Sequence, residues 1–95
     1  MSDRVVRLTV TGLVQGVGFR AFVAEVARRQ GVSGWVRNRR DRSVEALLVG
    51  PSDRVGETIV AVRRGLPGSQ VEGVETHEPG PTASALRDFR ILPTV

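Results

Sequence analysis

Apolar and polar residues alternate over positions 4–11, with Val6, Leu8 and Val10 on one face. A period of two predicts a half-buried β-strand there. After a glycine-bearing loop at positions 12–18, apolar residues recur three and four positions apart, which predicts an amphipathic helix that Gly31 is placed to end. The apolar stripe of this helix consists of Phe19, Phe22, Val23, Val26 and Ala27.

The middle of the chain predicts a hairpin and a second helix. Positions 34–38 and 43–49 are strand-like and flank a polar turn at positions 39–42, so we expect them to pair. A helix then opens after Pro51, with Ser52 as its expected N-cap and Asp53 at the positive end of its dipole. Its buried stripe consists of Val55, Ile59, Val62 and Leu66. Gly65 and Pro67 are its stop signals.

The last third of the chain predicts two more strands. Val71 and Val74 belong to the first, and we expect a bulge at Gly73 because their spacing breaks the alternation. Positions 77–84 are expected to form a loop, and positions 86–92 alternate again with Phe89 and Ile91 facing inward. The order is β-α-β-β-α-β plus a short last strand. It predicts one domain over residues 1–95, of the α+β class. The expected fold is a ferredoxin-like α/β sandwich (split βαβ), an antiparallel sheet with two helices on one face.

The loop before the first helix has the features of an anion site. Gly16 and Gly18 allow a sharp turn in which successive N–H groups point inward, and the free N–H groups of the helix start add to the same positive field. Arg20, in the first helical turn, offers a rigid fork for phosphate oxygens. The alternative is that the glycines only make a tight turn and that Arg20 is a solvated surface charge.

Topology brings Asn38 to this loop. In a split βαβ sheet the first and second strands run parallel with the third between them, so their C-terminal ends share one edge. Asn38 ends the second strand, two strand spacings or about 9.5 Å from the first. A phosphate at the loop would therefore lie within reach of Asn38. Considered alone, Asn38 is better explained as a turn residue.

Two other templates fit the glycine loop poorly. Gly16, Gly18 and Ala21 match a loose dinucleotide-binding fingerprint, with Asp41 about twenty residues on. That fingerprint needs parallel βαβαβ units, whereas a hairpin follows here. Positions 16–23 also resemble the aromatic motif of RNA-recognition domains, but that motif belongs on the third strand, which has no aromatic residue here.

Two longer segments resemble a known family. Positions 12–20 (GLVQGVGFR) and 34–45 (GWVRNRRDRSVE) are similar to the two signatures of the acylphosphatases, and the resemblance extends over essentially the whole chain. It implies a ferredoxin-like sandwich that hydrolyses acyl phosphates, and that Asn38 orients the attacking water. It also implies that the phosphoryl group is bound by Arg20 and by backbone N–H groups of Gln15, Gly16, Val17, Gly18 and Phe19.

Three positions depart from the family pattern. Leu13 stands where a basic residue is usual, and Arg39 stands where a small hydroxyl residue is often seen. Arg42 replaces the glycine that usually follows the turn aspartate, so we expect either strain in the hairpin or a different turn type. The departures bear on hairpin geometry and substrate affinity, and they leave Arg20 and Asn38 in place.

The composition limits the available chemistry. The chain has no cysteine and no lysine, its fourteen basic residues are all arginine, and its net charge is +4. A positive charge suits a small phosphorylated substrate or nucleic acid, although replacement of Lys by Arg throughout the proteome explains the composition equally well. The first ten residues, which include Asp3, Arg4 and Arg7, do not resemble a signal peptide, and no apolar run approaches the ~18 residues of a membrane span. We therefore expect a cytoplasmic protein with no membrane partner.

The missing residue types agree with an acyl phosphate substrate. Its leaving group is a carboxylate with a pKa of about 4, so no general acid is needed, and a loose phosphoryl transition state needs charge and an aligned water. We expect no metal and no cofactor, and inorganic phosphate as product and inhibitor of a monomeric enzyme. The single histidine, His77, is expected on the surface, and Asp41 and Glu45 are expected to support the hairpin.

Two non-enzymatic functions stay open on the sequence. One is an acylphosphatase-like domain without activity, or a module for carbamoyl phosphate handling, which usually stands at the front of a longer protein. The other is an arginine-rich nucleic-acid binder, which the sequence disfavours. Turnover of a simple acyl phosphate tests the first, and salt-dependent retention on DNA or RNA tests the second.

Overall fold

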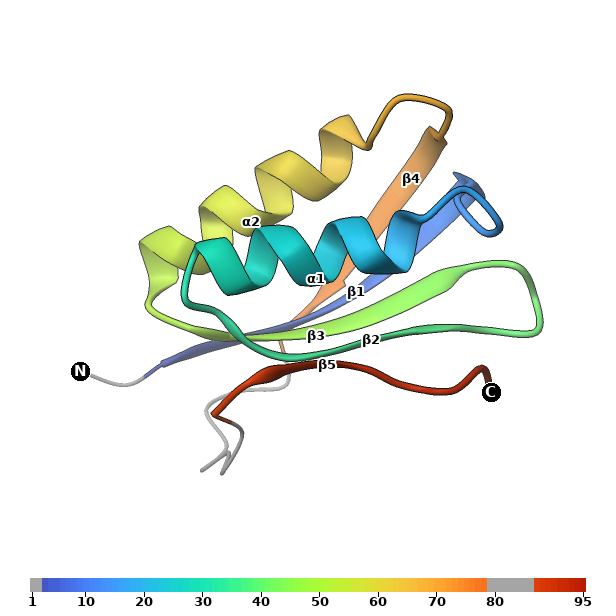
Figure 1. The fold of residues 1–95 in the computed structure, drawn as a ribbon. Helices are drawn as coiled ribbons and strands as arrows, with labels where there is room; N and C mark the ends of the chain where they lie inside the picture. Colours follow the sequence, from blue (N-terminus) through green and yellow to red (C-terminus); the bar gives the residue numbers. More distant parts are fainter. Residues whose placement is uncertain (1–2, 79–86) are drawn as a thin grey trace.

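The computed structural model describes residues 3–78 and 87–95. One five-stranded sheet, in the order β4-β1-β3-β2-β5, carries both helices on the same face (Figure 1). The elements, in chain order, are β1 (Arg4–Leu13), α1 (Phe19–Arg29), β2 (Ser33–Asn38), β3 (Val44–Gly50), α2 (Ser52–Arg64), β4 (Gln70–His77) and β5 (Phe89–Ile91). This is the ferredoxin-like α+β fold that the residue pattern predicts. Among the described residues, no helix has the length and apolar character needed to span a membrane.

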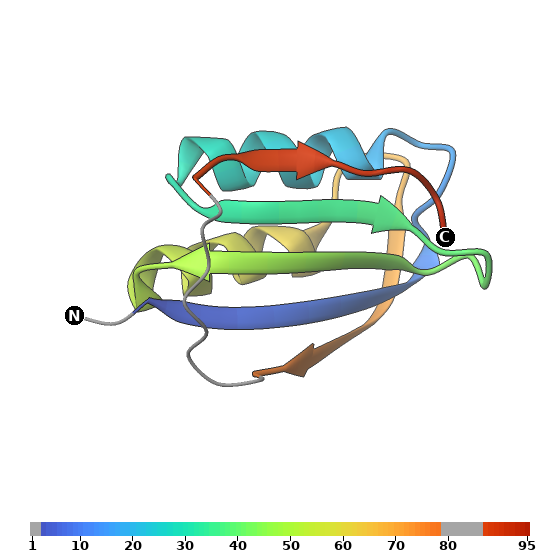
Figure 2. The same cartoon turned by 90° about the horizontal axis from the view of Figure 1, so that it is seen from below.

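The strand directions determine which strand ends lie at the same edge of the sheet. Strand β3 pairs antiparallel with β1 and with β2, so β1 and β2 run parallel and end at the same edge of the sheet (Figure 2). The expectation of an antiparallel sheet is wrong for β5, which pairs parallel with β2 and makes the sheet mixed. The reason is geometric: β4 runs antiparallel to β1 and ends at the edge where β2 starts. A strand that begins there and pairs with β2 has to run parallel to it.

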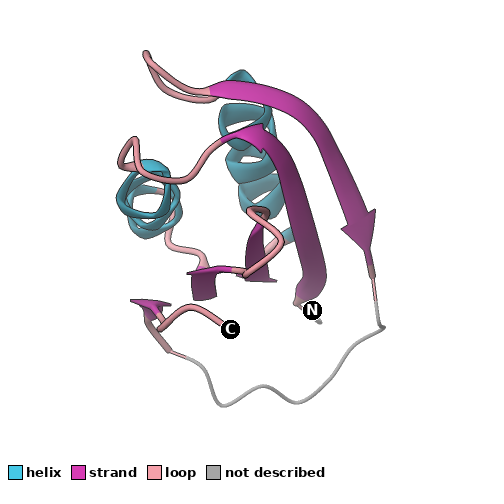
Figure 3. Cartoon of the chain, turned by 90° about the vertical axis from the view of Figure 1, so that its right-hand side faces the viewer, coloured by secondary structure: helices cyan, strands magenta, loops and turns pink. Residues whose placement is uncertain are grey.

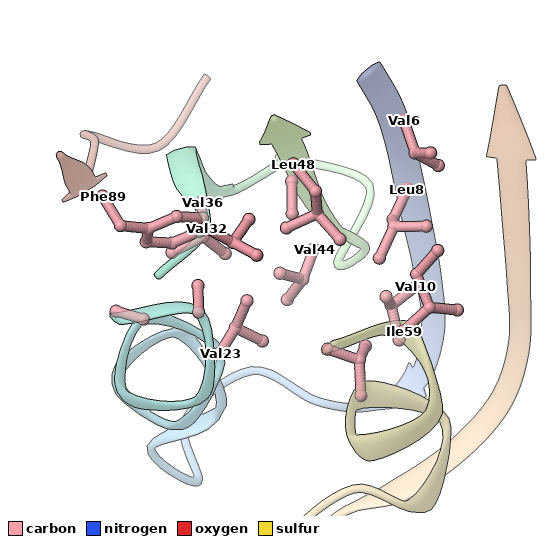
Figure 4. Close-up of a cluster of buried hydrophobic side chains, with 14 of the residues drawn as sticks. Val6, Leu8, Val10, Val23, Val32, Val36, Val44, Leu48, Ile59 and Phe89 are labelled. Carbon is pink, nitrogen blue, oxygen red and sulfur yellow. The ribbon is translucent and has the colours of Figure 1, made fainter. Parts of the chain in front are cut away.

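The core lies between the sheet and the two helices. Val6, Leu8 and Val10 of β1 are at most 1% exposed, as their alternation predicts. Figure 4 shows them on the same side of the sheet as side chains of the other strands, facing Val23 of α1 and Ile59 of α2. The end-on view shows both helices packed on one layer of strands (Figure 3). Since the apolar stripes of both helices are directed into one core, the helices hold the sheet from a single side.

Several local expectations need correction. Pro51, not Ser52, occupies the N-cap of α2, and no side chain caps this helix; Asp53 does lie in its first turn. Leu66 is half-buried rather than fully buried. Ile91 is 44% exposed instead of facing the core, because it is the last residue of a three-residue strand at the sheet edge.

The C-terminal strands also differ in detail from the expectation. The β1–β4 register shifts so that Thr11 pairs with Gly73 and Gly12 with Val71, which leaves the bulge at Glu72, one residue before the predicted position. His77 ends β4 and does not belong to the predicted loop. The rest of that loop, except for residue 78, lies outside the described residues, as does the beginning of the predicted strand at position 86.

The hairpin turn between β2 and β3 contains backbone strain. The N–H of Arg42 donates to the carbonyl of Arg39 at 3.1 Å, and the N–H of Arg39 donates to the carbonyl of Ser43 at 2.9 Å. Arg42 has a φ of 75° and is the one non-glycine residue with positive φ in the described ranges. The side chain of Asp41 accepts hydrogen bonds from the hydroxyl and the N–H of Ser43, which hold the pKa of this carboxyl below its usual range. The turn thus keeps its shape although a left-handed position carries arginine.

Replacing Arg42 with glycine is expected to stabilise the protein. A left-handed backbone costs a residue with a Cβ about 1–2 kcal/mol, and glycine avoids that cost. The free energy of unfolding of Arg42→Gly should therefore rise by about 1 kcal/mol, which raises the Tm by roughly 4–8 °C in a domain of this size. The matched control is Arg40→Gly, which removes an identical charge from the same turn where φ is not positive. Its Tm should stay the same or fall, and a Tm of Arg42→Gly no higher than that of wild type would contradict the strain.

Candidate active site

The loop between β1 and α1 has the backbone of an anion site. Gly16 and Gly18 have φ values of 77° and 82°, in the left-handed region where residues with a Cβ are strained. Gly18 is the N-cap of α1, and the first turn of this helix has no acidic residue. The partial positive charge of the helix start is therefore not neutralised by its own side chains, and inward N–H groups can face a bound anion.

A pocket joins this loop to the end of β2. It has a volume of about 200 Å³, and Arg20 and Asn38 line it together with both glycines of the loop. Its lining residues are Val14, Gly16, Gly18, Phe19, Arg20, Ala21, Asn38 and Ile91. Figure 1 shows the loop and the β2–β3 turn at the same end of the molecule. The two residues that the sequence singles out thus lie in one pocket.

The sheet register explains this meeting. Val44 of β3 pairs with Val10 of β1 on one side and with Asn38 of β2 on the other. Asn38 is therefore two strand spacings, about 9.5 Å, from the strand that leads into the glycine loop. The register confirms that the single strand β3 lies between Asn38 and β1, as the topology predicts.

Arg20 carries a charge that no carboxylate of the described residues neutralises. It is half-buried, and among the described residues no Asp or Glu oxygen lies within 4.0 Å of its guanidinium group. Arg37 and Arg39 differ in this respect, because both form ion pairs with Glu45. A guanidinium that faces a pocket without a counter-ion is well suited to bind an anion there.

Asn38 has a buried acceptor without a partner. Its Oδ1 is shielded from solvent and accepts no hydrogen bond from any described residue. Leaving a buried acceptor unpaired costs about 1–3 kcal/mol, so folding stability does not explain this side chain. Because Asn38 also lines the pocket, a bound group that donates a hydrogen bond to Oδ1 would satisfy this acceptor.

The side-chain role of Gln15 and the place of Ile91 in this region are not predicted from the sequence. The side chain of Gln15 does not line the pocket; its Nε2 donates to the carbonyls of Arg39 and Ser43, at 2.8 Å each. Sequence reasoning had assigned only the backbone N–H of Gln15. Ile91 lines the pocket because the parallel pairing of β5 places it beside Val36 of β2, and no sequence signal predicts that pairing. Val17 is packed against the core rather than in the pocket.

The remaining titratable candidates have structural contacts. Glu45 is 5% exposed, and its carboxylate lies 2.7 Å from Arg37 and 3.7 Å from Arg39. His77 is exposed and pairs with Arg7 in the N-terminal half of β1, away from the loop. Within the part of the chain that the structure describes, no three His, Cys, Asp or Glu side chains are placed to hold a metal ion. The polar groups of the pocket lining that remain as candidates for binding or chemistry are Arg20, Asn38 and backbone N–H groups.

The comparisons with known proteins identify the family of the chain. The acylphosphatase family model matches residues 6–91. An acylphosphatase from Rhizorhabdus wittichii is 48% identical over 95 residues, which cover 98% of this chain and 93% of that protein. The crystal structure of acylphosphatase from Bacillus subtilis superposes with a TM-score of 0.89 at 38% identity, covering 93% of this chain and 97% of the other.

A more distant likeness concerns the fold alone. Full-length HypF, in a phosphate- and nucleotide-bound form, gives a TM-score of 0.86 at 23% identity, and the match covers 97% of this chain but 12% of HypF. The family is decided by the closer matches, which run along nearly the whole length of both proteins. This chain belongs to the acylphosphatase family, the hydrolases that act on acyl phosphates.

Proposed function

We propose that the enzyme cleaves the carboxyl–phosphate bond by direct attack of water on phosphorus, with Arg20 and the glycine loop binding the phosphoryl group and Asn38 placing the water. The observation that carries this proposal is that Asn38, whose Oδ1 is buried without a partner among the described residues, lines the same pocket as Arg20, whose charge no described carboxylate neutralises. The guanidinium of Arg20 needs an anion, and Oδ1 of Asn38 needs a hydrogen-bond donor. A phosphoryl group with a water molecule beside it satisfies both.

The phosphoryl group is bound by two kinds of donor. The guanidinium of Arg20 offers two parallel N–H groups, and the loop offers the backbone N–H groups of residues 15–19. These donors face the oxygens on which charge is spread in the transition state, so they act in the chemical step as well as in binding. Inorganic phosphate presents the same oxygens, so we propose that it is the product and also a competitive inhibitor.

The water needs an orienting group more than it needs a base. The amide of Asn38 can accept a hydrogen bond through Oδ1 and donate one through Nδ2. Holding the water in line with the scissile bond converts a random encounter into an aligned attack. A loose transition state forms little bond to the water before the leaving group departs, so strong activation of the nucleophile is not required.

The substrate follows from the same set of residues. A carboxylate leaving group, with a pKa of about 4, departs without a proton, and the pocket has no side chain placed as a general acid among its lining residues. We propose carboxyl–phosphate anhydrides as substrates, not sugar or protein phosphates, and a mechanism without metal or cofactor. We further propose that residues 1–95 act as a monomeric single domain in the cytoplasm.

Replacing Asn38 with alanine is expected to separate binding from chemistry. Without the amide the water loses its alignment, so kcat should fall by about 10²–10³-fold, the usual effect of removing one transition-state hydrogen bond. Inhibition by inorganic phosphate should stay within a few-fold of wild type, because the loop and Arg20 remain. A melting curve controls for damage to the hairpin. If phosphate inhibition weakened in step with kcat, Asn38 would be a phosphate ligand and the division of roles would be wrong.

Replacing Arg20 with alanine is expected to abolish turnover and phosphate inhibition together. The removal takes away the one full charge in the pocket lining, so kcat/KM should fall by at least about 10²–10³-fold. Arg20→Lys should also fail, because an ammonium group does not reproduce the bidentate fork. Arg63→Ala, which removes an exposed arginine from the last turn of α2, is the matched control. Activity above a tenth of wild type in Arg20→Ala would exclude Arg20 from the site.

Exhaustive chelation is expected to leave activity unchanged. The measurement is the rate of acetyl phosphate and benzoyl phosphate hydrolysis before and after dialysis against EDTA. The expectation rests on the donor set of the pocket, in which nitrogen donors of arginine and backbone supply the positive field. A loss of activity that Mg²⁺ or Zn²⁺ restores would overturn the metal-free mechanism.

A further inference from the structure

Gln15 connects the two halves of the site without entering the pocket. It lies between Val14, which is 1% exposed, and the left-handed Gly16. Its side chain reaches across to the β2–β3 turn, where Nε2 donates to the carbonyl oxygens of Arg39 and Ser43 at 2.8 Å each. The two hydrogens of the amide nitrogen are therefore both used, which fixes the side chain in one orientation.

The two carbonyls that Gln15 binds define the shape of the turn. The carbonyl of Arg39 also accepts the N–H of Arg42, and the carbonyl of Ser43 also accepts the N–H of Arg39. Gln15 supplies a second hydrogen bond to each oxygen, so its amide belongs to the hydrogen-bond network of the turn. Arg39 directly follows Asn38, and any displacement of the Arg39 carbonyl is passed to the Asn38 backbone.

No other hydrogen bond between described residues joins the glycine loop to this turn. The loop itself contains Gly16 and Gly18, which restrict the backbone less than any other residue type. Without Gln15 no hydrogen bond between described residues would join the loop to the turn, and the β1–β3–β2 pairing and the packing of Val14 and Phe19 in the core would alone relate the loop to Asn38. Catalysis needs them in a fixed relation, because a misplacement of about 1 Å can cost 10²-fold in rate.

We propose that Gln15 is a positioning residue, whose side chain sets the distance between the phosphate-binding loop and Asn38. The inference rests on the proposed function and adds a residue that touches neither phosphate nor water through its side chain. Arg20 and the loop N–H groups stay within one segment when Gln15 is altered, so phosphate binding should persist. What should be lost is the alignment of the water with the bound phosphoryl group.

The first test replaces the amide with an apolar group of similar length. Gln15→Met should lower kcat by about 10- to 100-fold, while inhibition by inorganic phosphate stays within a few-fold of wild type. Gln30→Met is the matched control, since Gln30 caps α1 at its other end and its side chain accepts a hydrogen bond from Arg54. The control should keep wild-type kcat. A wild-type kcat in Gln15→Met would overturn the inference.

The second test uses pH. It is made in the Arg42→Gly protein, which takes the place of wild type, because Arg42 borders the same hollow as Gln15 and its guanidinium would favour a carboxylate there. In Gln15→Glu the ionised carboxylate would face two carbonyl oxygens, which disfavours the charged form and raises its pKa above the ordinary value of about 4.3. The neutral acid, populated as pH falls through that raised pKa, can donate one hydrogen bond. The ratio of Gln15→Glu kcat to wild-type kcat should therefore rise as pH falls toward 5, whereas the ratio for Gln15→Met should be flat. Parallel profiles for the two variants would contradict a donor role.

A double-mutant cycle separates positioning from a general loss of structure. If Gln15 acts by placing Asn38, then Gln15→Met should change kcat less than about 3-fold when Asn38 is already alanine. An equal loss in both backgrounds would mean that Gln15 acts independently of Asn38, and it would overturn the inference. Failure of the proposed function looks different: Asn38→Ala alone would then keep wild-type kcat, whatever Gln15 does.

Discussion

The placement of β3 between β1 and β2 is the constraint on which the site depends. Because β3 runs antiparallel to both neighbours, β1 and β2 are parallel and end together, and Val44 has Val10 on one side and Asn38 on the other. The glycine loop leaves one of these strand ends, and Asn38 closes the other. No side chain has to be long to bring the two together, since the sheet fixes the separation of the two strand ends.

The functional end of the molecule carries the unfavourable features of the fold. The charge of Arg20 has no carboxylate partner among the described residues, Oδ1 of Asn38 is buried without a donor from them, and Arg42 holds a left-handed backbone. Elsewhere the inward side chains form a continuous apolar core, as in Figure 4. Strain and unpaired polar groups persist only where surrounding structure over-determines them. We therefore regard the core and the paired strands as the support that lets the pocket stay preorganised for an anion and a water.

The sequence predicted the features that local periodicity and sheet topology determine. It did not predict the features that depend on long-range pairing. Arg20 and Asn38 meet in one pocket because their elements follow from residue patterns and from the split βαβ order. The parallel pairing of β5 with β2, which brings Ile91 to the pocket, has no such local signal. The contact of Gln15 with the turn likewise depends on where a loop side chain ends in space. For Arg42 the sequence left two alternatives, strain in the hairpin or a different turn type, and the φ of 75° fits strain.

The proposed mechanism requires that the glycine loop bind the phosphoryl oxygens through backbone N–H groups and that Asn38 take no part in holding them. A ¹H–¹⁵N NMR titration of the wild-type protein with inorganic phosphate tests this most directly. The amide resonances of Gly16, Gly18 and Arg20 should shift together and saturate at one phosphate concentration, and Asn38→Ala should give the same shifts at a concentration within a few-fold of it. If the loop amides did not move, or if the Asn38→Ala protein no longer bound phosphate, the central claim would be contradicted.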